Sequence, residues 1–226
     1  PENLSISSDK SEELKEKLHD VETGEYGASD EKEALSKFTK ELEENISDNI
    51  ETFLTSDEQD KNLGLINLEE ISNTKATLHI TELYLTSLLH FARDNPDKCP
   101  RVLVVVEEAH TVMPEPNTVG LGDFDSKGLV SKISQIALQG RKYGVGLLVI
   151  AQRTATVSKS ILTQCNSVIS FNCYDDTSLK FLKNIFGESY TEVIPNLPFL
   201  QAVIAGNALR SDSPMIVEIP YDESKE

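Results

Sequence analysis

Apolar residues recur at helical spacing in the first sixty residues of the chain. The members of this stripe lie three to four positions apart: Leu35, Phe38, Leu42, Ile46, Ile50 and Phe53. Asp30 is placed to cap the helix, with Glu33 three residues later as in a capping box. We therefore expect residues 1–60 to form a helical insertion or hairpin with a solvated polar face. A helix that docks a partner is the alternative.

After residue 60 the pattern changes to short apolar runs that alternate with helical stretches. Residues 102–106 are five consecutive apolar residues, four of them β-branched, which is typical of a strand buried on both faces of a parallel sheet. The other expected strands are residues 63–68, 145–151, 168–171, 201–205 and 215–219, the last two as an antiparallel hairpin. The expected helices are residues 77–93, 127–142, a short turn at Ile161, and one that starts at Asp175 or Asp176 and ends at Gly187. This alternation predicts an α/β layered domain.

The acidity of the chain belongs mainly to its first sixty residues. The formal net charge is −17, from 38 acidic and 21 basic side chains, and residues 1–60 contain 19 of the acidic but only 6 of the basic ones. An acidic chain binds DNA poorly through non-specific electrostatics. Any DNA contact therefore has to come from a local basic surface, repeated around an oligomer.

The cysteines and the hydropathy limit the setting of the protein. Cys99, Cys165 and Cys173 are odd in number and lack metal-site spacing, which disfavours a disulfide framework or a zinc site. Such cysteine usage fits a reducing compartment. No run of eighteen apolar residues occurs, so we expect a cytoplasmic protein without a membrane-spanning helix.

The strongest chemical signal is a pair of adjacent carboxylates, Glu107 and Glu108, directly after the strand at 102–106. Ligands of open α/β sheets bind at the carboxyl ends of the strands. There Glu107 can hold Mg²⁺ through water, and Glu108 can orient or deprotonate an attacking water. The plainer alternative is a solvated pair that caps the next helix. We expect His110 in the first turn of that helix, without a catalytic role.

A second signal lies at residues 140–153, where a glycine-rich turn leads into the strand at 145–151. Gln152 stands at the tip of this strand, where it can sense a γ-phosphate or an attacking water. A glutamine satisfied by loop backbone is the alternative. Arg141 and Lys142 end a helix and so complement its dipole, or Arg141 serves as an arginine finger toward a neighbour's nucleotide.

Together these stretches resemble the HerA/FtsK superfamily of ring ATPases. The matching segments are VVVEEAH (104–110), GRKYGVGLLVIAQR (140–153), SKSILTQCNSVISF (158–171) and LPFLQAVIAG (197–206). The resemblance implies a RecA-like (ASCE) P-loop NTPase core, mostly parallel and flanked by helices, that occupies residues 61–226. It also implies ATP and Mg²⁺ as cofactors, a homo-hexamer on double-stranded DNA, and a nuclease or other effector as partner in DNA end processing or anti-phage defence.

The resemblance also implies roles for individual residues. Glu107 matches the Walker B acid that holds the metal, Glu108 matches the catalytic glutamate, and Gln152 matches the sensor. An arginine that acts on the neighbouring subunit's nucleotide is implied near this region. Arg141 and Arg153 are both candidates, Arg153 then lying at the nucleotide.

One family motif is absent from the sequence. The phosphate-binding pattern G-x-x-x-x-G-K-[ST] does not occur in the 226 residues, nor does any Gly-Lys dipeptide. We therefore expect the chain alone to be inactive, with the loop on an N-terminal half or on another chain. The strand that bears the loop normally lies between the strands matching 146–151 and 167–171, so a gap or a rearranged sheet is expected there. A non-catalytic assembly or effector-docking module is the alternative reading.

Overall fold

The computed structural model describes residues 28–56, 62–71, 73–115 and 124–221. These residues belong to two compact units. The first comprises residues 1–104 and 135–147, and the second residues 105–134 and 148–226. The division expected at residue 60 stays a prediction, and the helical expectation for residues 1–27 lies outside the described residues.

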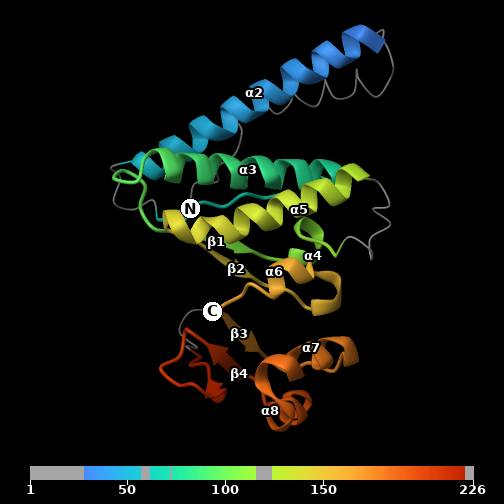
Figure 1. The fold of residues 1–226 in the computed structure, drawn as a ribbon, viewed down its shortest axis with the longest axis vertical. Coiled ribbons are helices and arrows are strands. Elements are labelled where there is room, and N and C mark those ends of the chain that lie inside the picture. Colours follow the sequence, from blue (N-terminus) through green and yellow to red (C-terminus); the bar gives the residue numbers. More distant parts are fainter. Residues whose placement is uncertain (1–27, 57–61, 72, 116–123, 222–226) are drawn as a thin grey trace. The chain divides into compact units, whose positions relative to one another are not determined.

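Two long helices, α2 (Ala28–Thr55) and α3 (Thr74–Asp94), pack against each other in the first unit, and α2 approaches α3 toward its own C-terminal end (Figure 1). Ile46 of α2 is buried, and the hydroxyls of Ser47 and Ser87 lie 3.2 Å apart. The helix predicted from the apolar stripe is therefore present. It begins two residues before Asp30, so that residue lies inside the helix rather than at its cap.

The segment at residues 63–68 corrects one prediction, because it contains no strand. Leu63 and Leu65 are 72% and 55% exposed. The Asn67 side chain accepts a hydrogen bond from the Glu69 backbone N–H and so starts a turn instead. An apolar run forms a strand only where a partner strand satisfies its backbone groups, and the described residues offer none here.

Strands β1 (Val102–Val106) and β2 (Val145–Val149) form a two-stranded parallel sheet. Its hydrogen bonds run from Val102 N–H to the Gly144 carbonyl at one end and from Ile150 N–H to the Val106 carbonyl at the other. Helix α3 packs on one face, where apolar side chains of the three elements line a small pocket: Leu85, Leu88, Leu89, Val104, Val145 and Leu147.

The opposite face of this sheet corrects the expectation of burial on both sides. Leu103 and Val105 of β1 are 62% and 50% exposed. Leu148 and Ile150, from β2 and its end, are exposed as well. Alternate side chains of a strand point to opposite faces, and parallel sheets are normally covered on both. The part of the chain that the structure describes supplies a cover for one face only.

The second unit has a three-stranded antiparallel sheet in the order β3–β4–β5. Its strands are β3 (Ser167–Ser170), β4 (Gln201–Gly206) and β5 (Met215–Glu218). Ser167 pairs with Gly206, and Gln201 pairs with Glu218. The hairpin predicted for the last two strands is therefore present. Parallel pairing in the described residues is limited to β1 and β2.

The remaining helical segments of the described residues follow. They are α4 (Ala109–Val112), α5 (Phe124–Gln139), η1 (Gly140–Tyr143), η2 (Thr154–Thr156), α6 (Lys159–Leu162), α7 (Asp176–Phe186), α8 (Glu188–Val193) and η3 (Ile194–Asn196). Asp175 caps α7 by accepting a hydrogen bond from Ser178 N–H, and the helix ends at Gly187, both as predicted. None of the described helices is long and apolar enough to cross a membrane.

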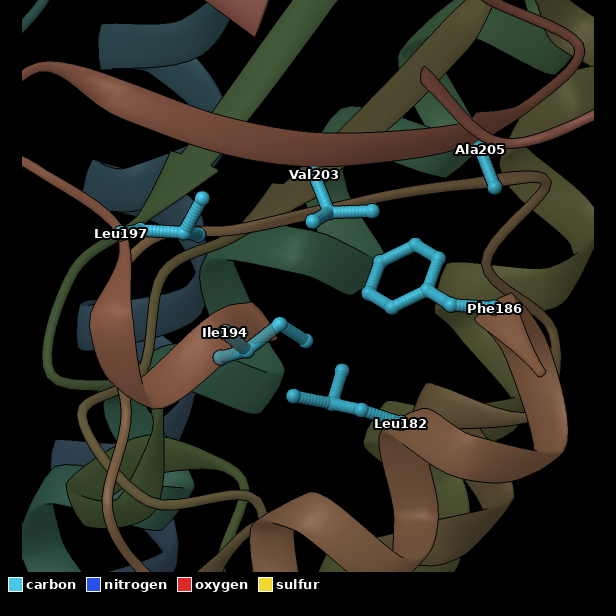
Figure 2. Packing of buried hydrophobic residues seen from close by; sticks show 6 residues of the cluster. All are labelled: Leu182, Phe186, Ile194, Leu197, Val203 and Ala205. Carbon is cyan, nitrogen blue, oxygen red and sulfur yellow. The ribbon is translucent and has the colours of Figure 1, made fainter. Parts of the chain in front are cut away.

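The core of the second unit lies between the β3–β4–β5 sheet and the helices that precede β4. Figure 2 shows the buried side chains that meet there: Leu182, Phe186, Ile194, Leu197, Val203 and Ala205. Burial of such side chains contributes about 1.5–3 kcal/mol each to folding. This cluster fixes α7, α8 and η3 against β4.

Strands β2 and β3 are not hydrogen-bonded neighbours, and they belong to separate sheets. Within the described residues, no strand pairs with the edge of β2 opposite β1 or with the edge of β3 opposite β4. The resemblance predicted a missing strand between these two elements. That expectation stays a prediction.

Gly206 at the end of β4 should not tolerate a side chain. Its φ is 105°, and a Cβ would lie 2.2 Å from the Asn166 carbonyl oxygen. We expect Gly206→Ala to lower the free energy of unfolding by at least about 2 kcal/mol, measured by denaturant unfolding. Gly128→Ala in α5 is the matched control. A Cβ there has no neighbour within 4 Å, so it should stabilise by up to about 1 kcal/mol. Equal effects of the two substitutions would contradict this account.

Candidate functional site

The two adjacent carboxylates stand at the carboxyl end of β1, and both are exposed. Glu108 has φ 45° and ψ 47°, the left-handed conformation, which is uncommon for a residue other than glycine. The backbone N–H and the hydroxyl of Thr111 donate to the Glu108 carbonyl at 2.8 and 2.9 Å. A conformation of this kind costs about 1–3 kcal/mol and persists where its surroundings hold it, often at functional sites.

Gln152 meets Glu108 across the two parallel strands. Its Nε2 donates a hydrogen bond of 2.8 Å to Glu108 Oε1. Backbone bonds keep the strand ends in register, from Ile150 N–H to the Val106 carbonyl and from Ala109 N–H to the Ile150 carbonyl. The structure thus brings together two residues that lie 44 positions apart. The glutamine bonds a carboxylate, where the alternative interpretation expected loop backbone.

His110 is a third member of this cluster, one that sequence reasoning did not assign to the site. Its Nδ1 lies 3.3 Å from Glu108 Oε2, the carboxylate oxygen that Gln152 does not bond. Both side chains are about half exposed, at 45% and 51%. The only sequence signal was a histidine two residues after the acid. Its approach depends on the tight turn at Glu108.

Arg153 lies next to Gln152 and close to the start of α7. Hydrogen bonds from the backbone and hydroxyl of Ser178 hold the pKa of Asp175 below its ordinary value, and the charge of Arg153 lowers it further. The N–H and the hydroxyl of Thr154 both bond the buried Ser178 oxygen, at 3.2 and 3.1 Å. The loop after β2 is therefore fixed to α7. No sequence pattern pointed to Ser178.

The segment after α4 pairs with the segment after η2. Pro114 and Val157 form an antiparallel bridge, and Glu115 N–H donates to the Thr156 carbonyl at 2.9 Å. The Glu115 carboxylate accepts a hydrogen bond of 2.9 Å from Lys159 N–H. The loops that follow Glu108 and Gln152 are thus hydrogen-bonded to each other. These bonds hold Glu108 and Gln152 in position relative to one another.

Arg141 belongs to the first unit, where it is exposed on η1. Its assignment as an arginine finger stays a prediction, as does the choice between Arg141 and Arg153.

The carboxylates suit a hard divalent cation better than a soft one. Mg²⁺ keeps several waters and is usually held by one or two carboxylates together with substrate phosphates. Glu107 offers such an oxygen at the exposed end of β1. The described residues contain no group of three or more His, Cys, Asp or Glu side chains arranged for a metal. The donor set therefore fits Mg²⁺ bound along with a nucleotide. The backbone cradle for the phosphates is not encoded in these residues.

The fold is that of part of a P-loop NTPase. The genome packaging NTPase B204 of Sulfolobus turreted icosahedral virus 2, solved in complex with AMP, superposes with a TM-score of 0.53. The alignment covers 76% of this chain and 71% of that one at 13% identity. The sulfate complex of the same NTPase gives 0.52. At this identity the likeness establishes the fold alone.

Sequence comparison identifies more specific relatives than the P-loop NTPase fold does. The DNA double-strand break repair helicase HerA of Sulfurisphaera tokodaii is 30% identical over 185 residues, which is 76% of this chain. HerA of Sulfolobus acidocaldarius is 27% identical over 231 residues, or 97% of this chain. The chain spans 35% and 44% of these relatives' own lengths. No family model matches the sequence. These similarities place the chain among relatives of the HerA/FtsK-type ATPases.

Proposed function

We propose that the chain is the part of an ATP-driven DNA translocase or helicase that carries the water-activating and sensing residues. The observation that carries this proposal is the 2.8 Å bond between Glu108 and Gln152, at the carboxyl ends of two adjacent parallel strands. A carboxylate and an amide in that position suit the attack of water on a phosphate. The helicase relatives and the NTPase fold support the same activity.

In this proposal each strand-end residue has its own task. Glu107 would hold Mg²⁺ through water, and Glu108 orients the attacking water and accepts its proton. Gln152 keeps the Glu108 carboxylate in place and responds when the phosphate leaves. Mg²⁺, when bound, neutralises charge on the phosphates. Arg141 or Arg153 stabilises the transferring phosphate of a neighbouring subunit.

The phosphate-binding loop must come from a segment outside these 226 residues or from another chain, since they contain no such motif. We call these residues together with that segment the complete protein. In our proposal it forms a hexameric ring in the cytoplasm and acts on double-stranded DNA. The net charge of −17 means that DNA contacts come from local basic side chains repeated around the ring. A nuclease or other effector would act with it, in end processing or anti-phage defence.

The first test is Mg-ATP binding and hydrolysis by the chain alone. We expect no turnover, because the 226 residues contain no phosphate-binding motif for the β- and γ-phosphates. The measurement is phosphate release, with and without double-stranded DNA. Turnover that disappears in Glu108→Gln would contradict this account, because the chain would then hold phosphate by another route.

The absent loop also supports a second candidate, a non-catalytic module that keeps the ATPase-derived fold for assembly or for docking an effector. The two candidates differ in what the complete protein does. A folded complete protein that contains a phosphate-binding loop yet hydrolyses no ATP would favour the module.

A further inference from the structure

We propose that His110 is a positioning residue for Glu108, which it holds through a hydrogen bond from Nδ1–H to Oε2. The inference rests on the proposed function, in which Glu108 orients the attacking water. It adds a residue to which neither the family resemblance nor the sequence assigns a role.

The Glu108 carboxylate is approached from two sides. Gln152 Nε2 bonds Oε1 at 2.8 Å, and His110 Nδ1 lies 3.3 Å from Oε2. The usual range for an N–H···O hydrogen bond is about 2.7–3.2 Å, so the second contact lies just beyond it, and a rotation of the imidazole would complete the bond. With one donor on each oxygen, the plane of the carboxylate would then be fixed. A carboxylate held by Gln152 alone could still turn about that single bond.

The backbone explains why the histidine can reach the acid. Residues two apart do not face each other on a regular helix. Glu108 is in the left-handed conformation, outside the first turn of α4, and this turn brings its side chain back toward His110. The strain at Glu108 is therefore used to place the carboxylate between two donors from different elements.

A purely structural role fits His110 less well. Its side chain is 45% exposed, so it contributes little to the core. Nor does it cap the start of α4, where Glu108 is the capping residue and no side-chain cap hydrogen bond is present. The contact that the structure gives its imidazole is with the Glu108 carboxylate.

The first arm of the test determines, in this chain, which nitrogen of the His110 imidazole carries the proton. Long-range ¹H–¹⁵N spectra, recorded at a pH where the imidazole is neutral, distinguish the two neutral tautomers. We expect His110 to be protonated at Nδ1, and Glu108→Ala to return it to the Nε2–H form. The exposed His79 on α3 is the internal control and should not change. An Nε2–H tautomer for His110 in the unmodified chain would overturn the proposal.

The second arm measures ATP turnover in the complete protein. We expect His110→Ala to lower kcat by about tenfold with little change in KM, because a carboxylate free to turn is misplaced for the water. His110→Asn, whose amide can donate from near the Nδ1 position, should restore most of kcat. His110→Gln, which places its amide near the Nε2 position, should not. Thermal unfolding of each variant separates these effects from loss of fold.

The outcomes separate this inference from the function on which it rests. Loss of turnover in Glu108→Gln together with full turnover in His110→Ala would overturn the positioning role alone. Retained turnover in Glu108→Gln would overturn the proposed function and the positioning role with it. Equal losses in the Asn and Gln variants of His110 would also overturn the assignment to Nδ1.

Discussion

Glu108→Gln should lower ATP hydrolysis by the complete protein at least a hundredfold, while ATP binding persists. General base catalysis contributes about 10²–10⁴ in rate, and an amide cannot accept the proton of the attacking water. The substitution keeps the size of the side chain, so the turn at Glu108 and the sheet register should survive. Single-turnover hydrolysis and binding of a labelled nucleotide measure the two quantities separately.

Glu192→Gln on α8 is the charge-matched control, because it removes one exposed carboxylate from another part of the second unit. It should leave turnover unchanged. Equal turnover in Glu108→Gln and Glu192→Gln would remove Glu108 from the chemistry. A parallel loss of ATP binding in Glu108→Gln would indicate a metal-binding role for this carboxylate instead.

Phe186→Ala should have the largest effect on stability, about 3–5 kcal/mol in the free energy of unfolding of the second unit. Phe186 is 3% exposed and packs with Leu182 and Val203 in the core between α7 and β4 (Figure 2). Truncation removes its apolar contacts and leaves a cavity that its neighbours can fill only in part. Denaturant unfolding followed by circular dichroism measures the loss.

Phe199→Ala is the matched control for this prediction. Phe199 is 86% exposed, so its removal should change the free energy of unfolding by less than about 0.5 kcal/mol. A similar loss in the two variants would mean that the cluster around Phe186 is not the core of this unit.

Much of the fold followed from local signals in the sequence. The valine-rich run at 102–106 and the apolar run at 145–149 form strands because β-branched and apolar side chains favour a packed sheet. Asp175 and Gly187 delimit α7. The Asp175 side chain accepts a hydrogen bond from a backbone N–H of the first turn, and Gly187 adopts the positive φ at which the helix ends.

Other features depended on neighbours that no local pattern specifies. The segment at 63–68 reads as a strand but has no partner among the described residues. Leu103 and Val105 read as buried but lie on the uncovered face of the β1–β2 sheet. An apolar run shows that a segment can be buried, whereas the structure decides whether anything covers it.

The candidate site was predictable where it depends on topology. Residues that follow adjacent parallel strands meet at one edge of a sheet, which is how Glu108 and Gln152 come together. The contacts of His110 and Ser178 were not predictable. The first depends on a left-handed turn at a glutamate, and the second on where the start of α7 lies in space.

We propose that these residues belong to a DNA-dependent ATPase. The most direct test is phosphate release from Mg-ATP by the complete protein, with and without double-stranded DNA. We predict Mg-dependent hydrolysis that DNA stimulates, with a stimulation that weakens as salt rises because phosphate contacts release counterions. A folded complete protein that carries a phosphate-binding loop but shows no hydrolysis, with or without DNA, would contradict the account and leave the assembly module as the better explanation.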